Sequence, residues 1–365
     1  MPLYAKSLGA RDSEIGLLLG LFAAAAMVLR LPVGWYLDRG RRVPALVVGA
    51  IIFAISSAGY ALTGTIAALL ALRLFHGTGM AIFTTAGQTL AVDIAPAGRR
   101  GETLGIYGTA TNIAAMLGPA IGMALASAVG FRQLFLICAG IATSALILSA
   151  LIREPRYHHS ELGDSGEPTA RAERRPTNPF NRAVIGPGLA MLALMFTYGA
   201  ISSFVPLIAI QRGLANPGLF FAVYAGAMIV SQGVAGRLSD RFGRWSAVLV
   251  GLTLVVVGIV AVALLGGWWL LVAGGIYGLG AGAASPALYA AAGDLVPPRQ
   301  RGSAMATMGL FLEMGIASGS ILTGILAGLV GLTSAFWAVA GATASATVVI
   351  GAMARLRQAA STSQH

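Results

Sequence analysis

Apolar stretches of roughly 20 residues recur along the whole chain, and this recurrence constrains the fold more than any other feature. A helix needs about 20 apolar residues to cross a hydrocarbon layer ~30 Å thick. Hydrophobic residues make up 57% of the chain and charged residues only 10%, so too few polar side chains remain to cover a water-soluble domain. The sequence therefore predicts an all-α polytopic membrane protein.

Eleven apolar spans are expected to form transmembrane helices. They are 15–37, 44–62, 66–92, 102–127, 131–152, 183–210, 217–238, 245–265, 268–293, 302–329 and 332–353. We expect the first span to remain in the protein and not to act as a cleavable signal peptide, because no small-residue cleavage site follows it.

The basic residues are distributed unequally between the loops on the two sides. Almost all arginines lie in loops 38–43, 93–101, 153–182, 239–244 and 294–301 and in the tail after residue 353, whereas the opposite loops hold only Lys6, Arg11, Arg132 and Arg212. Cytoplasmic loops are enriched in Lys and Arg. This bias predicts a multi-pass protein of the inner (cytoplasmic) membrane with a cytoplasmic C-terminus. It also explains the net charge of +11 without a nucleic-acid partner.

The chain contains an internal repeat. Gly34, Asp38, Arg39 and Arg42 recur at an offset of 202 as Gly236, Asp240, Arg241 and Arg244, and Asp93, Pro96, Arg100 and Gly101 recur at an offset of 201 as Asp294, Pro297, Arg301 and Gly302. Two halves in the same orientation require an even number of helices in each half. We therefore expect two six-helix bundles related by pseudo-two-fold symmetry, at residues 1–152 and 183–365, joined by a cytoplasmic linker at 153–182.

The first half has five predicted spans, and the repeat indicates which helix is missing. Pro2, Leu3, Ala5 and Gly9 match Pro206, Leu207, Ala209 and Gly213 at the end of the first helix of the second half. Met1 therefore lies where a first helix would be ending. We expect the end of helix one and helices two to six in the first half, and helices seven to twelve in the second. The alternative is a natural eleven-helix variant.

The loop after the second expected helix carries a family resemblance. Residues 34–42 (GWYLDRGRR) and their repeat 236–244 (GRLSDRFGR) resemble the signature of the major facilitator superfamily, although the second glycine of the first copy comes one position early, at Gly40. The resemblance implies that Asp38, Arg39, Arg42, Asp240, Arg241 and Arg244 hold the cytoplasmic gate shut. Topology-determining positive charge alone would explain the arginines but not the two aspartates.

A motif in the third expected span extends the resemblance. Residues 73–79 (RLFHGTG) are similar to the family's fourth-helix motif, which implies a role for Arg73 in proton coupling. The alternative is that the Arg73 side chain reaches the nearby outer surface.

A second motif resembles the fifth-helix pattern of the family's drug and proton antiporters. The match is partial: this sequence has Gly105, Gly118, Pro119 and Gly122, but Ala114 and Met123 stand where the pattern has glycines. That pattern implies a moving domain interface and favours efflux; ordinary small-residue packing is the alternative.

Glu313 is the single carboxylate deep inside any predicted span. It is expected ~16 Å from the cytoplasmic start of its helix, where such transporters place substrates and coupling ions. Its counterpart in the first half is Asn112. Burial favours the neutral form of a carboxylic acid, so Glu313 is a candidate proton carrier with Arg73 as a possible partner; the alternative is a protonated, hydrogen-bonded packing residue. Arg30 is expected to reach the cytoplasmic surface.

The favoured function is proton-coupled export of a small amphipathic molecule or metabolite by alternating access. The alternatives are proton-coupled uptake of a sugar, organic acid or other metabolite, and a non-transporting membrane sensor. Enzymatic activity is not expected, because H-E-x-x-H and G-x-S-x-G motifs are absent. No cofactor or metal is predicted, and the expected partners are the substrate, protons and the lipid bilayer around a monomer.

Overall fold

The computed structural model describes residues 1–365 except 40, 95–99, 154–179, 298–299 and 363–365. Every regular element in the described residues is a helix. The elements are α1 (Pro2–Ser7), α2 (Asp12–Arg39), α3 (Arg42–Leu62), α4 (Ile66–Asp93), α5 (Arg100–Leu151), a 3-10 turn (Arg182–Val184), α6 (Ile185–Gln211), α7 (Gly218–Phe242), α8 (Arg244–Leu264), α9 (Trp269–Asp294), α10 (Arg301–Val330) and α11 (Leu332–Thr362).

The predicted spans are confirmed as helices, and α5 contains two of them. Gly130 interrupts α5 with φ 84° and ψ 166°, a backbone conformation that only glycine adopts readily. In the described residues, nine helical stretches are long and apolar enough to cross a membrane, and 218–232 is a shorter apolar helix. The protein is therefore a multi-pass membrane protein with an all-helical fold.

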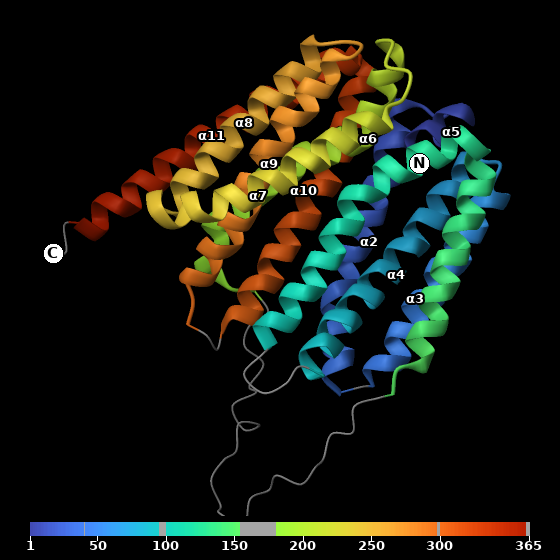
Figure 1. Ribbon diagram of the computed structural model, residues 1–365, viewed down its shortest axis with the longest axis horizontal. Coiled ribbons are helices and arrows are strands. Elements are labelled where there is room, and N and C mark those ends of the chain that lie inside the picture. Colours follow the sequence, from blue (N-terminus) through green and yellow to red (C-terminus); the bar gives the residue numbers. More distant parts are fainter. Residues whose placement is uncertain (40, 95–99, 154–179, 298–299, 363–365) are drawn as a thin grey trace, which may run out of the picture.

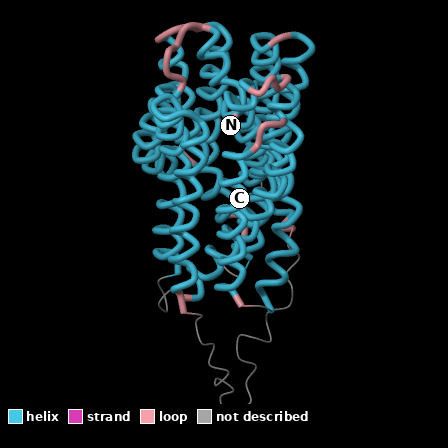
Figure 2. The backbone as a smooth tube through the Cα atoms, turned by 90° about the vertical axis from the view of Figure 1, so that its right-hand side faces the viewer, coloured by secondary structure: helices cyan, strands magenta, loops and turns pink. Residues whose placement is uncertain are grey.

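The long helices pack side by side, with their connections gathered at two opposite ends (Figures 1 and 2). We call the end that holds Arg42 and Arg244 the arginine-rich end and the other the arginine-poor end. In the first half α4 packs against α2 and α3, and α3 packs against α5. In the second half α9 packs against α7 and α8, α10 against α6, and α11 against α8.

Equivalent glycines make equivalent contacts in the two halves, which supports the repeat read from the sequence. A Cβ on Gly49 of α3 would lie 2.7 Å from the backbone nitrogen of Phe83, and one on Gly251 of α8 would lie 2.7 Å from that of Ala284. Gly251 and Ala284 follow Gly49 and Phe83 by 202 and 201 residues. The boundary of the halves within 153–182 stays a prediction, because 154–179 lie outside the described residues.

Side chains of other segments donate hydrogen bonds to the backbone carbonyls at the ends of α3 and α8. Arg212 donates from Nη1 to the oxygens of Val262 (2.7 Å) and Leu265 (2.6 Å), and from Nη2 to that of Ala263 (2.9 Å). In the first half the Tyr4 hydroxyl bonds the carbonyl of Thr63. These contacts satisfy helix-terminal carbonyls that have no partner within the helix.

The halves meet along two seams, α2 against α10 and α5 against α7. A Cβ on Gly16 would lie 2.5 Å from the Ser320 carbonyl oxygen, so α2 and α10 are in backbone contact there. The Ser320 hydroxyl donates to the Gly16 carbonyl (2.8 Å) and lies 2.6 Å from the Ser203 hydroxyl. At the second seam, a Cβ on Gly218 would lie 2.8 Å from Cβ of Met123. Since α2 and α7 begin near these contacts, both seams are tight towards the arginine-poor end.

Candidate functional site

An ion pair joins the two halves at the α2–α10 seam. Nη2 of Arg30 on α2 donates to Oε1 of Glu313 on α10. The carboxylate side chain is 7% exposed and the arginine side chain 21% exposed, so water screens the pair only weakly. Among the described residues, this ion pair is the one that connects the first half to the second.

The pair leaves two polar atoms without partners among the described residues. Nε of Arg30 and Oε2 of Glu313 are both buried and form no hydrogen bond there. Tyr289 on α9 lies close enough to interact electrostatically with both charged groups, and Tyr107 on α5 interacts with Arg30. A Cβ on Gly309 would lie 3.5 Å from Nη1 of Arg30, so that glycine leaves space beside the guanidinium. The site thus offers one unpaired hydrogen-bond donor (Nε of Arg30) and one unpaired acceptor (Oε2 of Glu313), with two tyrosines nearby.

This geometry corrects the expectation for Arg30. Its side chain bonds Glu313 on the other half, so it does not extend to the surface as expected. Burial explains the outcome, because a carboxylate inside a helix bundle is stabilised most by a nearby cation. Glu313 is accordingly not a solitary charge. No pattern within α2 or α10 could have identified the partner, since the contact depends on how the two helices face each other.

Arg73 occupies a different place, inside the first half. Its guanidinium carbon lies 5.3 Å from the ring centroid of Phe22 and 5.7 Å from that of Tyr60, within cation–π range. The Tyr60 hydroxyl is 3.1 Å from Nδ1 of His76, and the ring of Phe53 meets the His76 ring edge-to-face. Arg73 therefore lies against aromatic rings of the first half, whereas Glu313 pairs with Arg30.

Among the described residues, the arginine-rich end shows an equivalent ion pair in each half. Nε of Arg42 lies 3.0 Å from Oδ2 of Asp93, and Nε of Arg244 lies 3.2 Å from Oδ2 of Asp294. Each pair links the start of one helix (α3 or α8) to the end of the next (α4 or α9). The aspartates were recognised as repeated residues but not as site residues, although their repetition beside repeated arginines was a usable signal.

Several predicted site residues have side chains outside the described part of the structure. They are Asp38, Arg39, Gly105, Asn112, Asp240 and Arg241. Of the remaining residues of the fifth-helix pattern, Gly118 and Gly122 face open space, and no atom would contact a Cβ within 4 Å at either position. The neighbours Ala120 and Met123 contact Gly218 of α7 instead. Residues of that helix therefore do lie at the seam between the halves, but Gly118 and Gly122 do not make the close contact.

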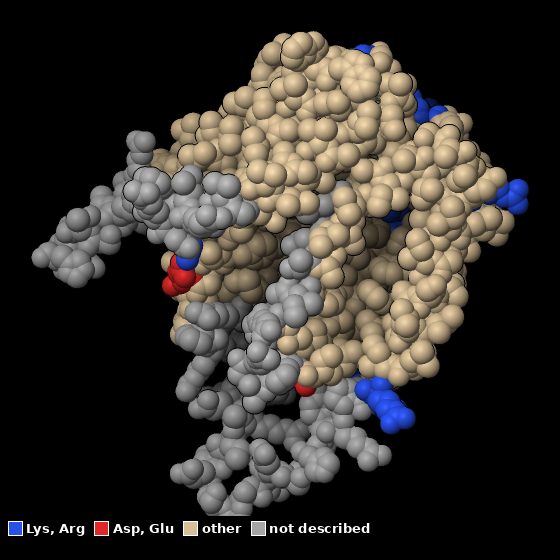
Figure 3. Space-filling model, in the orientation of Figure 1, with Lys and Arg blue, Asp and Glu red and all other residues tan. Residues whose placement is uncertain are grey.

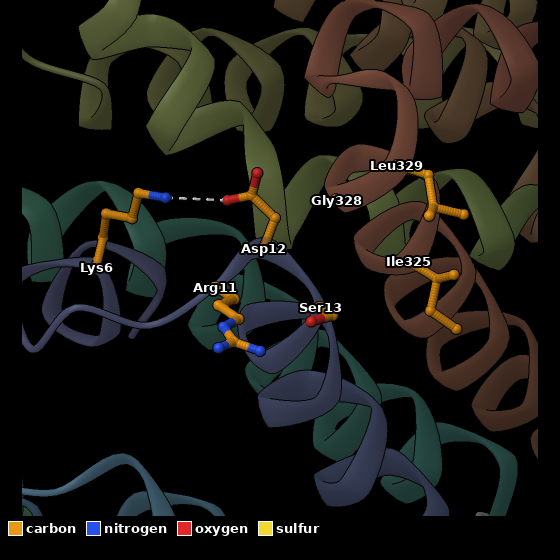
Figure 4. A pocket seen from close by; sticks show the side chains of 7 residues that line it. All are labelled: Lys6, Arg11, Asp12, Ser13, Ile325, Gly328 and Leu329. Atoms are coloured by element: carbon orange, nitrogen blue, oxygen red, sulfur yellow. Dashed lines mark hydrogen bonds and ion pairs between the residues drawn. The ribbon is translucent and has the colours of Figure 1, made fainter.

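Two hollows are visible. The face in Figure 3 is hollowed between the halves. A separate cavity of about 470 Å³ lies at the arginine-poor end, where Lys6, Arg11, Asp12 and Ser13 stand opposite Ile325, Gly328 and Leu329 (Figure 4). Nζ of Lys6 bonds Oδ1 of Asp12 across its polar wall at 3.1 Å. Within the described residues, no three His, Cys, Asp or Glu side chains gather as metal ligands.

The family model of the Major Facilitator Superfamily matches residues 1–266 and 214–364. The chain therefore belongs to that superfamily, whose members are transporters rather than enzymes.

Among curated relatives, an uncharacterised MFS-type transporter of Methanocaldococcus jannaschii is 25% identical over 92% of this chain and 88% of its own length. The multi-drug resistance efflux pump PmrA of Streptococcus pneumoniae is 24% identical over 93% of this chain and 86% of its own length. The staphylopine export protein of Staphylococcus aureus is 24% identical over 67% of this chain and 62% of its own length.

The fold is also that of a solved transporter. A bacterial homologue of the human lysosomal transporter Spinster, in an inward-facing and occupied conformation, superposes with a TM-score of 0.75 at 17% identity. The match covers 96% of this chain and 90% of the homologue. The predicted fold class is confirmed.

Proposed function

We propose that this protein is a secondary active transporter that exports a small amphipathic molecule in exchange for protons by alternating access. The observation that carries the proposal is the ion pair between Arg30 and Glu313 across the two halves. A proton bound to Glu313 removes the carboxylate charge and with it most of the attraction to Arg30. Protonation of one side chain thus changes the free energy with which the halves hold together, which is what proton coupling requires.

The two seams between the halves support an assignment of the side from which the substrate enters. Backbone contact between Gly16 and Ser320 closes the halves towards the arginine-poor end. We assign the arginine-rich end and the C-terminus to the cytoplasm by the positive-inside bias, in a bacterial-type inner membrane. The structure then represents a state that is closed outside and accessible from the cytoplasm, in which a monomer would take up its substrate for export.

The gate proposal rests on the repeated loop residues. Asp38, Arg39 and Arg42, with Asp240, Arg241 and Arg244, would close the cytoplasmic side once the halves rotate. The ion pairs of Arg42 and Arg244 support this role, because each pair joins the ends of two helices next to these loops. Export is favoured over uptake because two relatives are named as exporters, a multi-drug efflux pump and a staphylopine export protein.

The test uses inside-out membrane vesicles with an imposed pH gradient and a panel of fluorescent amphipathic probes. Wild-type vesicles should accumulate at least one probe only while the gradient lasts. Glu313→Gln keeps the size of the neutral acid but cannot titrate, so it should abolish gradient-driven accumulation and retain probe exchange without a gradient. Glu14→Gln, at the arginine-poor end, is the matched control. Accumulation by Glu313→Gln at the wild-type rate and pH dependence would remove Glu313 from coupling, and gradient-driven release of preloaded probe would instead indicate uptake.

A further inference from the structure

Two atoms of the Arg30–Glu313 ion pair that have no hydrogen-bond partner could bind a ligand. Glu313 is 5% exposed, yet its Oε2 has no hydrogen-bond partner among the described residues, and the same holds for Nε of Arg30. A buried charged group with an unmet hydrogen bond is costly. One atom needs a donor and the other an acceptor, so a single ligand group that both donates and accepts would satisfy both.

The net charge of the site further restricts which ligands can bind. Arg30 and Glu313 neutralise each other, and the other described groups that interact with them electrostatically, Tyr107 and Tyr289, are uncharged phenols. A ligand with a net charge would therefore add an uncompensated charge to a weakly hydrated site, which is unfavourable. A ligand without net charge avoids this cost, and the tyrosine rings offer apolar surface to the rest of the molecule.

We propose that the Arg30–Glu313 pair is the headgroup subsite of the transporter and selects amphipathic substrates whose polar head is net neutral but carries both a donor and an acceptor. Amides, hydroxyls and zwitterions meet this description. The inference rests on the proposed transport function and adds the substrate class to it.

The proposal makes opposite predictions for the two members of the pair. Arg30→Gln leaves the carboxylate uncompensated, so the subsite becomes negative and should gain affinity for cations. Glu313→Gln leaves the guanidinium, so the subsite becomes positive and should gain affinity for anions. A residue that merely held the halves together would lower the affinity for every ligand without reversing a charge preference.

Three dansyl compounds test this because they share one aromatic body: dansyl amide is neutral, dansyl cadaverine carries an ammonium group and dansyl glycine a carboxylate. Binding is measured by fluorescence titration of purified protein in nanodiscs at one neutral pH, without a gradient. Wild-type protein should prefer dansyl amide by at least about tenfold over both charged probes. Arg30→Gln should shift the preference to dansyl cadaverine and Glu313→Gln to dansyl glycine. Arg132→Gln, which alters an exposed arginine, should behave as wild type.

Opposite shifts of the charge preference in the two single variants would support the headgroup subsite. A wild-type preference for a charged probe, or single variants whose preferences do not move in opposite directions, would overturn it, including the case in which none of the proteins binds any probe. If a single variant fails to fold, the exchanged pair Arg30→Glu with Glu313→Arg restores both charges and should again prefer the neutral probe. The titration involves no proton gradient, so its failure is distinguishable from failure of the coupling test on Glu313→Gln.

Discussion

Arg42 and Asp93 form an ion pair that is nearly buried, whereas its repeat in the second half is open to solvent. The side chains of the first pair are 12% and 16% exposed, and those of Arg244 and Asp294 are 35% and 62% exposed. The N–O distances are similar, 3.0 and 3.2 Å, so the difference between the pairs lies in screening by water. The duplicated contact should therefore stabilise the first half more than the second.

We accordingly expect Asp93→Asn to lower the free energy of unfolding by about 1.5 to 3 kcal/mol, as for the loss of a hydrogen bond to a charged group. Asp294→Asn should leave the melting temperature almost unchanged, because an exposed pair contributes little. Thermal denaturation in detergent, followed by the loss of the monodisperse peak in size-exclusion chromatography, measures both. Equal losses for the two variants would contradict the assignment of the difference to burial.

A double-mutant cycle on Arg30 and Glu313 should show strong coupling. Removing one partner leaves the other charge buried and unpaired, and each single glutamine variant should therefore lose about 3 kcal/mol of stability. The variant with both substitutions should be more stable than either single variant, because no lone charge remains. Unfolding in mixed micelles with increasing denaturing detergent gives the three free-energy differences. Additive losses would show that the two side chains act independently.

Much of the fold followed from the sequence because each span is encoded locally. The break between two helices at Gly130 and the helix starts at Arg42 and Arg244 fall within one or two residues of the predicted edges. The repeat was equally readable, since duplicated glycines keep their packing partners. Only local signals were needed for these features.

The candidate site was predicted in part. The depth of Glu313 follows from counting residues along one helix, and that residue does lie at the contact between the halves. Its partner could not be derived, because the rotation of α2 against α10 is set by packing at distant glycines such as Gly16. The roles of Asp38 and Asp240 stay predictions, since their side chains lie outside the described residues.

Asp38 belongs to the loop residues that we propose close the cytoplasmic gate. Asp38→Asn removes a negative charge beside an arginine-rich turn, so closure on the cytoplasmic side should weaken while membrane insertion persists. Reactivity of cysteines introduced on the cytoplasmic half of the hollow between the halves should rise. It is measured with a maleimide in a Cys138→Ala background, which lacks the single native cysteine. Unchanged reactivity together with unchanged transport would remove Asp38 from the gate.

A side chain at Gly16 should hold the α2–α10 seam apart. Its Cβ would lie 2.5 Å from the Ser320 carbonyl oxygen, closer than real atoms approach, so Gly16→Ala must separate the helices. Ala317 is 8% exposed and contacts this seam, and Ala317→Cys in the Cys138→Ala background reports the separation. Its labelling by an impermeant maleimide should become several-fold faster in Gly16→Ala. Gly122→Ala, where a Cβ meets nothing within 4 Å, serves as the control and should leave labelling unchanged.

Arg212→Gln should destabilise the second half. The substitution removes charge-assisted hydrogen bonds to the carbonyls of Val262, Ala263 and Leu265. Partial hydration of the freed carbonyls limits the loss to about 2 kcal/mol. The melting temperature in nanodiscs measures it, with Arg132→Gln as an exposed-arginine control. A melting temperature equal to that of the control would mean that water replaces the guanidinium at no cost.

The two capping side chains show that the repeat extends to a structural requirement that the residues themselves do not repeat. Thr63 and Leu265 lie 202 residues apart, at equivalent positions of the two halves, yet a tyrosine from α1 bonds one carbonyl and an arginine after α6 bonds the other. Each half thus ends a helix on a carbonyl that needs a donor, and each half supplies a different donor. Because the two donors differ in residue type, a comparison of residue identities between the halves would not reveal that they serve the same purpose.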